Sequence, residues 1–392
     1  MRPVFSDEDE AFREEVRAFY RKELPKDWFG GLSDEAEESR RITHEIKKKL
    51  AKKGWLTMAW PKQYGGQEAP LTRQVVFVEE SAYFRVNARD AGTGYLGIAI
   101  MQHGTEEQKQ RFLGPISRAE VDFHQGFSEP NAGSDLTGLT TKAWREGDDY
   151  VFSGQKIWGG HLEQADYSFF LARTDQEAPK HKGISFFIIP SDTPGLHADT
   201  FANMGGGNQQ IVYYDNCRVN AQECIIGAEN QGWYIAATAL NHERAFVEHA
   251  ANGARLMEEI VELWRSADRH NANDHRTIVL RNKLAQVAIE VQVCRLLNYR
   301  FIWLYGEGRD PSYEASQVKI FGSEMTQRFM HVAGEVLGFY SQIQRDNPKG
   351  SHVYLGGRVE HQIRYQPSYT LMGGTSEIQR NLIATRGLGL PR

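Results

Sequence analysis

The sequence has only three cysteines, no long apolar run and no excess of positive charge, and each absence excludes a class of protein. Cys217, Cys224 and Cys294 are odd in number, widely spaced and without a Cys-x-x-Cys pair. This pattern indicates free thiols in a reducing compartment rather than a disulfide framework. No apolar run approaches the roughly 18–20 residues that span a bilayer, and the N-terminus turns acidic at once, unlike a secretory signal. We therefore expect a soluble, cytoplasmic protein without membrane insertion.

The charge balance and the histidines exclude two further classes. The formal net charge is −5, so the chain offers no electrostatic reason to bind nucleic acid. The 13 histidines are scattered, and none lies in a His-Glu-x-x-His frame. The sequence therefore predicts no metal site.

The hydrophobic pattern changes twice along the 392 residues, which are too many for one simple core. The first 120 or so residues have helical spacing, and a Ser6–Asp9 pair and a Thr105–Gln108 pair have the form of capping boxes. The second box opens a short helix over 106–113, which Gly114-Pro115 should end. Short runs rich in aromatic and β-branched residues, bounded by turn residues, then predict strands at 150–152, 167–171, 183–189 and 210–214.

Helical spacing returns after the strands, with long helices expected over 232–267, 276–305 and 312–337 and a loop near 346–357. A helix–strand–helix order does not suit a doubly wound nucleotide-binding fold, in which strands and helices alternate. We therefore predict an α+β protein with three domains. These are an N-terminal helical domain (1–121), a β-barrel or sandwich (122–228) and a C-terminal helical bundle (229–392).

The segment 92–97 satisfies Gly-x-Gly-x-x-Gly letter for letter. In a dinucleotide site this motif follows a strand and opens a helix within a βαβ unit. Here it follows a helix-like stretch, and no second strand with an acidic residue comes after it. We interpret the segment as a turn between two helices rather than a nucleotide site.

A loop over 126–135, Gly-Phe-Ser-Glu-Pro-Asn-Ala-Gly-Ser-Asp, collects small residues, hydroxyls and a proline. Such a loop brings backbone N–H groups and hydroxyls close to a polar or anionic cofactor. A second segment, Gly-Gln-Lys-Ile-Trp at 154–158, ends a strand-like run on a flat indole that could cover a planar ring. Alone, Trp158 would be read as an ordinary half-buried aromatic of the β domain. Together, the two segments favour a site for a planar cofactor.

These two segments, the domain order and the C-terminal Gly-Thr-Ser-Glu-Ile-Gln-Arg at 374–380 together resemble the acyl-CoA dehydrogenases over nearly the whole chain. The resemblance implies FAD as cofactor and an acyl-CoA thioester as substrate, oxidised at Cα–Cβ. It also implies electron transfer to an electron-transferring flavoprotein and, within the C-terminal part, a four-helix bundle. Carried over residue by residue, it assigns cofactor binding to Phe127, Ser128, Gly133, Ser134, Trp158, Gly374, Thr375 and Glu377.

The catalytic base is predicted from chemistry and resemblance together. A carboxylate must lie beside the weakly acidic Cα proton, but Gly373 stands where much of the family has its glutamate before Gly-Thr. Glu243 lies on a helical stripe of apolar residues, where desolvation would raise the pKa of its carboxyl group towards a useful range. Glu243-Arg244 is similar to the glutamate–arginine pair that the isovaleryl and long-chain branches use. We therefore predict Glu243 as the base, with Arg244 beside it; the alternative is a glutamate at a wet subunit seam.

Assembly and exact reaction stay open at this point. The segment 266–275 has no Arg-x-x-Phe-Gly motif, which typical family members carry there, and divergent bacterial members that act on steroid or other bulky acyl-CoAs depart from the family pattern in a similar way. The resemblance implies a homotetramer, or a heterotetramer with a second acyl-CoA dehydrogenase-like subunit. Alternatives are a scaffold subunit without chemistry of its own and a flavoprotein of the same fold that acts as an oxidase or desulfinase.

Overall fold

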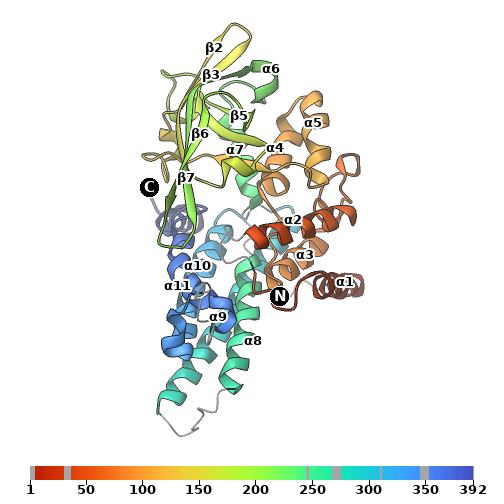
Figure 1. Ribbon diagram of the computed structural model, residues 1–392, viewed down its shortest axis with the longest axis vertical. Helices are drawn as coiled ribbons and strands as arrows, with labels where there is room; N and C mark the ends of the chain where they lie inside the picture. Colours follow the sequence, from red (N-terminus) through yellow and green to blue (C-terminus); the bar gives the residue numbers. More distant parts are fainter. Residues whose placement is uncertain are drawn as a thin grey trace.

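The computed structural model describes residues 5–30, 37–243, 247–266, 275–309, 311–344 and 353–391, without the side chains of 208, 238–243 and 247. Helices come first along the chain, a β sheet follows, and helices return, as the colours of Figure 1 show. Within the described ranges we find no helix with the length and apolar character of a membrane span. The α+β class predicted from the sequence is confirmed.

The N-terminal part consists of five α-helices. They are α1 (Asp7–Glu23), α2 (Glu37–Lys52), α3 (Leu71–Tyr83), α4 (Gly97–His103) and α5 (Glu106–Ser117). Both predicted capping boxes are confirmed: the Ser6 hydroxyl accepts a hydrogen bond from the Asp9 N–H at 3.1 Å, and the Thr105 hydroxyl accepts one from the Gln108 N–H at 3.3 Å. Each cap pairs otherwise orphaned N–H groups of a first turn.

The predicted end of α5 at Gly114-Pro115 is wrong, because the helix runs on to Ser117 with Pro115 inside it. Proline is costly in a helix interior because it removes one N–H donor and crowds the preceding turn. Pro115 lies in the last turn of α5, where few hydrogen bonds remain to be lost. The next residue, Ile116, is buried in the core and holds this turn in place.

The prediction that the Gly-x-Gly-x-x-Gly segment at 92–97 forms a turn between two helices is wrong. Residues Gly92–Leu96 form a π-helical turn that continues directly into α4. A Cβ atom on Gly97 would lie only 2.2 Å from the indole of Trp60, so this glycine permits close packing of α4 on the preceding loop. The segment follows helix α3 and not a strand, so its glycines serve packing and not nucleotide binding.

The middle part is an eight-stranded sheet in the order β6-β7-β3-β2-β4-β5-β8, with β1 paired to β4. Its elements are β1 (Phe123–Gly126), β2 (Lys142–Glu146), β3 (Asp149–Gly159), β4 (Tyr167–Arg173), β5 (Ile184–Pro190), β6 (Leu196–Ala202), β7 (Asn208–Asn220), β8 (Ile225–Ile226) and the short helix α6 (Ala221–Cys224). Most neighbours are antiparallel, whereas β4 pairs in parallel with β1 and β2.

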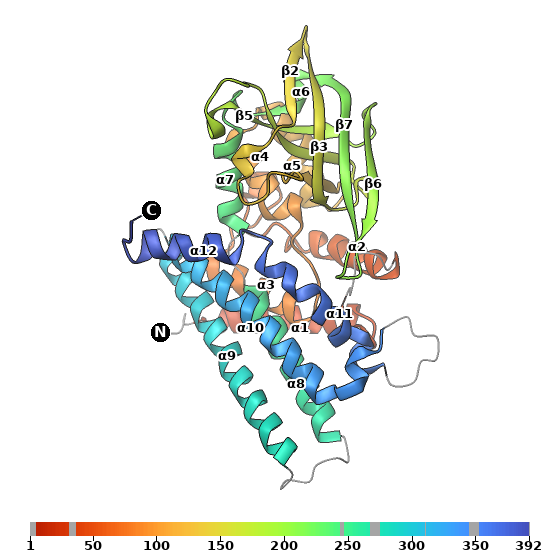
Figure 2. The same cartoon turned by 90° about the vertical axis from the view of Figure 1, so that its left-hand side faces the viewer.

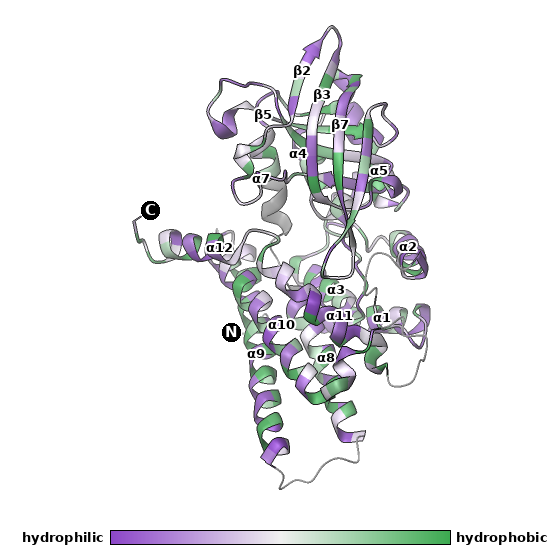
Figure 3. Ribbon diagram, turned by 60° about the vertical axis from the view of Figure 1, so that its left-hand side comes forward, coloured by the Kyte–Doolittle hydropathy of each residue, from purple (hydrophilic) through white to green (hydrophobic). Residues whose placement is uncertain are grey.

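Strands β4 and β5 are buried on both faces, which places a core on each side of the sheet. Successive side chains of a strand point to opposite faces, and Phe169 and Phe186 face a cluster shared with α4, α5 and α7. Phe170 and Phe187 face a second cluster with residues of β3 and β7. Hydrophilic and hydrophobic bands also follow one another along β3 and β7 (Figure 3).

The C-terminal part consists of α7 (Gly232–Glu243), α8 (Val247–Ser266), α9 (His275–Gly306), α10 (Glu314–Leu337), α11 (Arg358–Tyr365) and α12 (Ser376–Leu382). Helices α8, α9 and α10 lie side by side as long rods, and α11 lies beside α10 (Figure 2). They share an apolar core that includes Ile260, Cys294, Met325 and Phe329. The three cysteines are free and buried.

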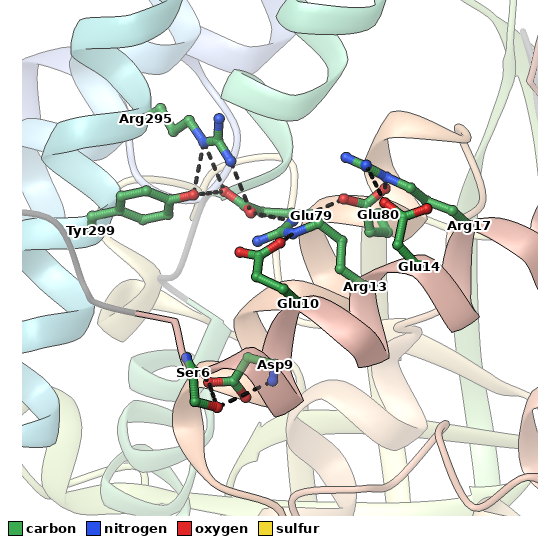
Figure 4. A network of polar contacts seen from close by, with 10 residues as sticks. All are labelled: Ser6, Asp9, Glu10, Arg13, Glu14, Arg17, Glu79, Glu80, Arg295 and Tyr299. Carbon is green, nitrogen blue, oxygen red and sulfur yellow. Dashed lines mark hydrogen bonds and ion pairs between the residues drawn. The ribbon is translucent and has the colours of Figure 1, made fainter.

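A buried polar network joins the first and last parts of the chain (Figure 4). On α3, Glu79 accepts hydrogen bonds from Arg13 of α1 at 3.0 Å and from the Tyr299 hydroxyl of α9 at 2.7 Å. Arg295 also donates to Glu79, at 3.3 Å, and Arg13 bonds Glu80 at 2.8 Å. Because unpaired charges are costly in the interior, the network fixes α3 against α1 and α9. Other residues of α3 line the two cavities described below.

Candidate active site

The loop over 127–135 is attached to strand β3 by its own backbone. The N–H of Ile157 donates to the carbonyl oxygen of Ser128 at 2.9 Å. Residues Glu129 and Ala132 form a small bridge that closes the loop on itself. The structure thus brings together the two segments that the sequence singled out.

A buried ion pair also fixes the loop to strand β3. The ammonium group of Lys156, on β3, lies 2.8 Å from a carboxylate oxygen of Glu129 in the loop, and the two side chains are 1% and 4% exposed. The same carboxylate accepts the N–H groups of Thr140 at 2.7 Å and Thr141 at 2.9 Å. Burial disfavours the ionised carboxylate, but Lys156 and these hydrogen bonds outweigh burial and lower the pKa of Glu129 to about 2. Sequence analysis did not predict this ion pair.

The side chains of the two residues before Glu129 point to different surroundings. Phe127 is buried among core aromatics, with its ring centroid 5.6 Å from that of Phe169 and 6.0 Å from that of Phe186. A ligand in front of the loop would therefore meet the backbone of Phe127 and not its ring. In contrast, the hydroxyl and N–H of Ser128 have no hydrogen-bond partner among the described residues, so they can serve a ligand.

Trp158 is displayed on the surface by an irregularity in its strand. The register between β3 and β7 shifts between Ile157 and Gly159, and Trp158 has a φ of 69°, which is rare for a bulky residue. Its side chain is 59% exposed and contacts Phe201 edge-on, at 5.4 Å between centroids. A large exposed aromatic in a strained backbone is typical of a ligand contact.

Open space lies beside two glycines of this surface. A Cβ atom added to Gly133 or to Gly160 would find no atom within 4 Å. Ser134, next to Gly133, is exposed. The free hydroxyl of Ser128, the exposed indole and these open glycines fit a flat, polar-edged group such as an isoalloxazine.

The C-terminal motif forms a turn and a helix start. Gly373 and Gly374 have φ values of 63° and 88°, a backbone that glycine adopts at little cost. The hydroxyl of Thr375 caps α12 by accepting the N–H of Ile378 at 3.3 Å. Glu377 is exposed in the first turn of α12. Helix α12 packs on α10, so among the described contacts this motif is not joined to the loop or to Trp158.

A cavity of about 470 Å³ lies between α3, α8, α11 and the end of β3. Gly159, Gly160 and His161, directly after Trp158, form one wall of this cavity, which we call the polar cavity. Glu248, His249 and Asn252 of α8 line it, as do Arg85, Arg89, Arg358, His361, Gln362, Tyr365 and Tyr369. Burial raises the pKa of Glu248 and lowers the pKa of His249 to about 4. Sequence patterns did not reveal this cavity, because its residues come from segments far apart in the chain.

A second cavity, of about 390 Å³, lies on the other side of Phe77, Val78 and Arg89, which line both. Its remaining walls are mostly apolar, and we call it the apolar cavity. They include Trp55, Leu56, Met58, Trp60, Ile98, Met101, Phe301 and Ile302. The two cavities together could hold an elongated ligand with polar and apolar parts.

The predicted catalytic base, Glu243, and its neighbour Arg244 lie at the edge of the described residues. Glu243 is the last residue of α7, but its side chain is not among those described, and Arg244 lies outside the described residues altogether. Helix α7 itself is anchored by Ile235 and Ala236, which are buried against α4 and the sheet. Glu248, five positions further along the chain, already lines the polar cavity.

Comparison with known families decides the identity. Family models described as the N-terminal, middle and C-terminal domains of acyl-CoA dehydrogenases match residues 6–120, 125–217 and 230–388. The chain belongs to the acyl-CoA dehydrogenase family. It is 33% identical to acyl-CoA dehydrogenase FadE26 of Mycobacterium tuberculosis, over 100% of this chain and 99% of that protein.

Two solved structures, those of the Tcur3481–Tcur3483 steroid acyl-CoA dehydrogenase and of the ChsE4–ChsE5 complex from M. tuberculosis, have the same fold. Each superposes with a TM-score of 0.88 over the full length of both chains, at 32% and 31% identity. This chain is therefore an acyl-CoA dehydrogenase, and the family is one of FAD-binding oxidoreductases.

Proposed function

We propose that this acyl-CoA dehydrogenase binds FAD against the Ser128 loop and Trp158, and that it converts an acyl-CoA into its trans-2-enoyl-CoA with Glu243 as base. The observation that carries the proposal is the surface around Ser128. There, a hydroxyl and an N–H without partners among the described residues are joined by the β3 backbone to an exposed indole, and Gly159 and Gly160, next to that indole, line the polar cavity. FAD, when bound, supplies the acceptor for the hydride that leaves Cβ.

The residues of this chain would contribute position and proton transfer. The Ser128 hydroxyl and N–H would bind the polar edge of the flavin, and Trp158 would cover the ring face away from the substrate. The Gly133–Ser134 turn would lie near a pyrophosphate or the entrance of the pantetheine arm, while Gly374, Thr375 and Glu377 would contact the FAD of the same or a neighbouring subunit.

Glu243, with Arg244 beside it, would remove the α-proton of the thioester. Removal of a weakly acidic proton requires a base held close to it, with a pKa matched to the working pH. Gly373, in the place of the other family glutamate, leaves that space without a second carboxylate. Two carboxylates in one site would hinder each other's ionisation.

The product separates dehydrogenation from the other reactions of this fold. We expect an acyl-CoA to be converted to its enoyl-CoA with an artificial electron acceptor, and we propose an electron-transferring flavoprotein as the natural one. Straight-chain, branched and steroid side-chain CoA esters should be screened together, because one of the similar structures is named a steroid enzyme. Peroxide formation matched to oxygen uptake would instead indicate an oxidase, and sulfite release from a sulfinate substrate a desulfinase.

The assembly is a second part of the proposal. The ChsE4–ChsE5 structure, which this chain resembles over its full length, is a complex of two different proteins. We propose that this chain is the glutamate-bearing subunit of a comparable heterotetramer, with a homotetramer as the alternative.

Expression of the chain alone, and together with a second acyl-CoA dehydrogenase-like subunit, tests this assembly. We expect low flavin content when the chain is expressed alone and about one FAD per pair of subunits after co-expression, measured by flavin absorbance and light scattering. A yellow homotetramer with one FAD per chain would show that no partner is needed.

A further inference from the structure

At one end of the polar cavity, two guanidinium groups donate hydrogen bonds to the same backbone carbonyl oxygen. Arg85, just after α3, and Arg358, at the start of α11, each direct their Nη1 atom to the carbonyl oxygen of Phe29 at 3.3 Å. Both side chains line the cavity. Two like charges are thus held within a short distance of each other, which is costly unless an anion balances them.

Among the residues that the structure describes, the carboxylates near this pair balance only part of its charge. Glu259 bonds Arg85 and also accepts a hydrogen bond from the Nε of Arg255 at 2.8 Å, so two guanidinium groups share this one carboxylate. Among the described residues, Arg358 has no carboxylate within ion-pair distance. Burial, together with the charge of Arg85, lowers the pKa of Arg358 to about 9. An anionic ligand would relieve this repulsion.

Arg85 also has a donor without a partner. Its side chain is 4% exposed, and its buried Nε forms no hydrogen bond. Buried donors are almost always paired in folded proteins. In addition, Arg85 has a φ of 58°, in the left-handed region that non-glycine residues rarely adopt. An unpaired donor on a strained residue in a cavity wall indicates a ligand that is held there.

The other titratable groups that face this end are compatible with an anion. Glu248 interacts with Arg89, and its pKa is raised by burial, so it is more easily protonated and can then donate to a carboxylate. His249, His361 and Tyr369 complete the wall with groups that can donate hydrogen bonds. The lining thus has an excess of positive charge and donors.

We propose that Arg85 and Arg358 bind a carboxylate carried by the acyl group, so that the substrates are CoA thioesters of acids with a second carboxyl group. This inference rests on the proposed dehydrogenation and deepens it. The phosphates of FAD and CoA are less suited to this position, because the Gly133–Ser134 turn, which we assign to a pyrophosphate or to the entrance of the pantetheine arm, is not part of the cavity wall. The apolar cavity beyond Phe77 and Arg89 would take hydrocarbon of a bulky substrate.

Binding to the FAD-loaded assembly tests the inference, with the Glu243→Gln substitution present to prevent turnover. Titration calorimetry compares adipyl-CoA with its monomethyl ester, and suberyl-CoA with its own, since each pair differs only in the charged end. We expect at least one free acid to bind about tenfold or more tightly than its ester, as a charge-assisted hydrogen bond provides. Equal or weaker binding of both free acids would overturn the inference without any further variant.

Substitutions then locate the anion site. Arg358→Met should reduce the preference for the free acid to about twofold or less and leave the affinity for the ester nearly unchanged. Arg358→Lys keeps a positive charge and should therefore retain part of the preference for the free acid. Arg328→Met, which removes a guanidinium from an exposed ion pair with Glu290 on a neighbouring helix, is the matched control and should keep the preference. An Arg358→Met assembly that keeps its FAD and its full preference would contradict the inference.

The two proposals fail in different ways. If the unsubstituted enzyme oxidises hexanoyl-CoA and the methyl esters as readily as the free acids, the dehydrogenase proposal stands and the carboxylate site is wrong. If it neither binds nor oxidises any of these thioesters, both are wrong.

Discussion

Replacing Glu243 by glutamine is expected to lower the rate of acyl-CoA oxidation about 10²- to 10⁴-fold, the usual contribution of a positioned general base. The amide keeps the size of the side chain but cannot accept the α-proton. FAD content and acyl-CoA affinity should stay close to those of the unsubstituted enzyme, because neither depends on proton transfer. Stopped-flow reduction of the flavin under anaerobic conditions measures the rate, and absorbance measures the flavin content.

Glu248→Gln is the comparison that makes this experiment specific. Glu248 is the described carboxyl group that lines the polar cavity from α8, and its pKa is raised by burial, as expected for a catalytic carboxyl group. If Glu243 is the base, Glu248→Gln should lose far less activity than Glu243→Gln. The opposite order, with near-normal turnover of Glu243→Gln, would transfer the role to Glu248.

Breaking the Glu129–Lys156 pair is expected to have the largest effect on stability. Lys156→Met leaves the Glu129 carboxylate buried without its cation, which typically costs about 3–5 kcal/mol. The loop that the pair fixes to β3 carries Ser128, so FAD should also dissociate more readily. Urea unfolding and the dissociation constant of FAD, followed by flavin fluorescence, measure the two effects.

A double-mutant cycle separates pairing from packing. Glu129→Gln with Lys156→Met removes both charges. We therefore expect the double variant to lose less unfolding free energy than the two single variants lose in sum. Strict additivity would mean that the pair does not couple the loop to the strand. The Arg118–Glu120 pair, which is exposed, is a control whose removal should change the free energy of unfolding far less.

The same pair predicts a pH dependence of stability. The folded-state pKa of Glu129 is about 2, whereas an unfolded glutamate has a pKa of about 4.3. A lowered pKa contributes stability that is complete above the unfolded value and is lost as the pH falls through that window towards 2. In Glu129→Gln this part of the acid sensitivity should be absent.

Short-range sequence patterns were sufficient to predict much of the fold. Both capping boxes, the change from helical to strand pattern near residue 122 and the return to helices after 230 follow from spacing within a few turns. The failures have a tertiary cause. Pro115 stays helical because Ile116 is buried, and the glycines at 92–97 are helical because α4 packs tightly on Trp60.

The site was predictable only where its residues are close in sequence. Ser128 and Trp158 stand in recognisable segments, and the structure joins those segments by a hydrogen bond and an ion pair. Arg85 and Arg358 are far apart in the chain and meet only because α3 and α11 enclose one cavity. The domain boundaries at 121/122 and 228/229 and the roles of Glu243 and Arg244 stay predictions.

An anaerobic single turnover with an acyl-CoA deuterated at Cα and Cβ tests the central claim most directly. Dehydrogenation predicts one equivalent of trans-2-enoyl-CoA per FAD, with one deuterium lost from each of the two carbons and bleaching of the flavin absorbance at the same rate. A bleached flavin without enoyl-CoA, or an enoyl-CoA formed only when oxygen is admitted, would contradict the account.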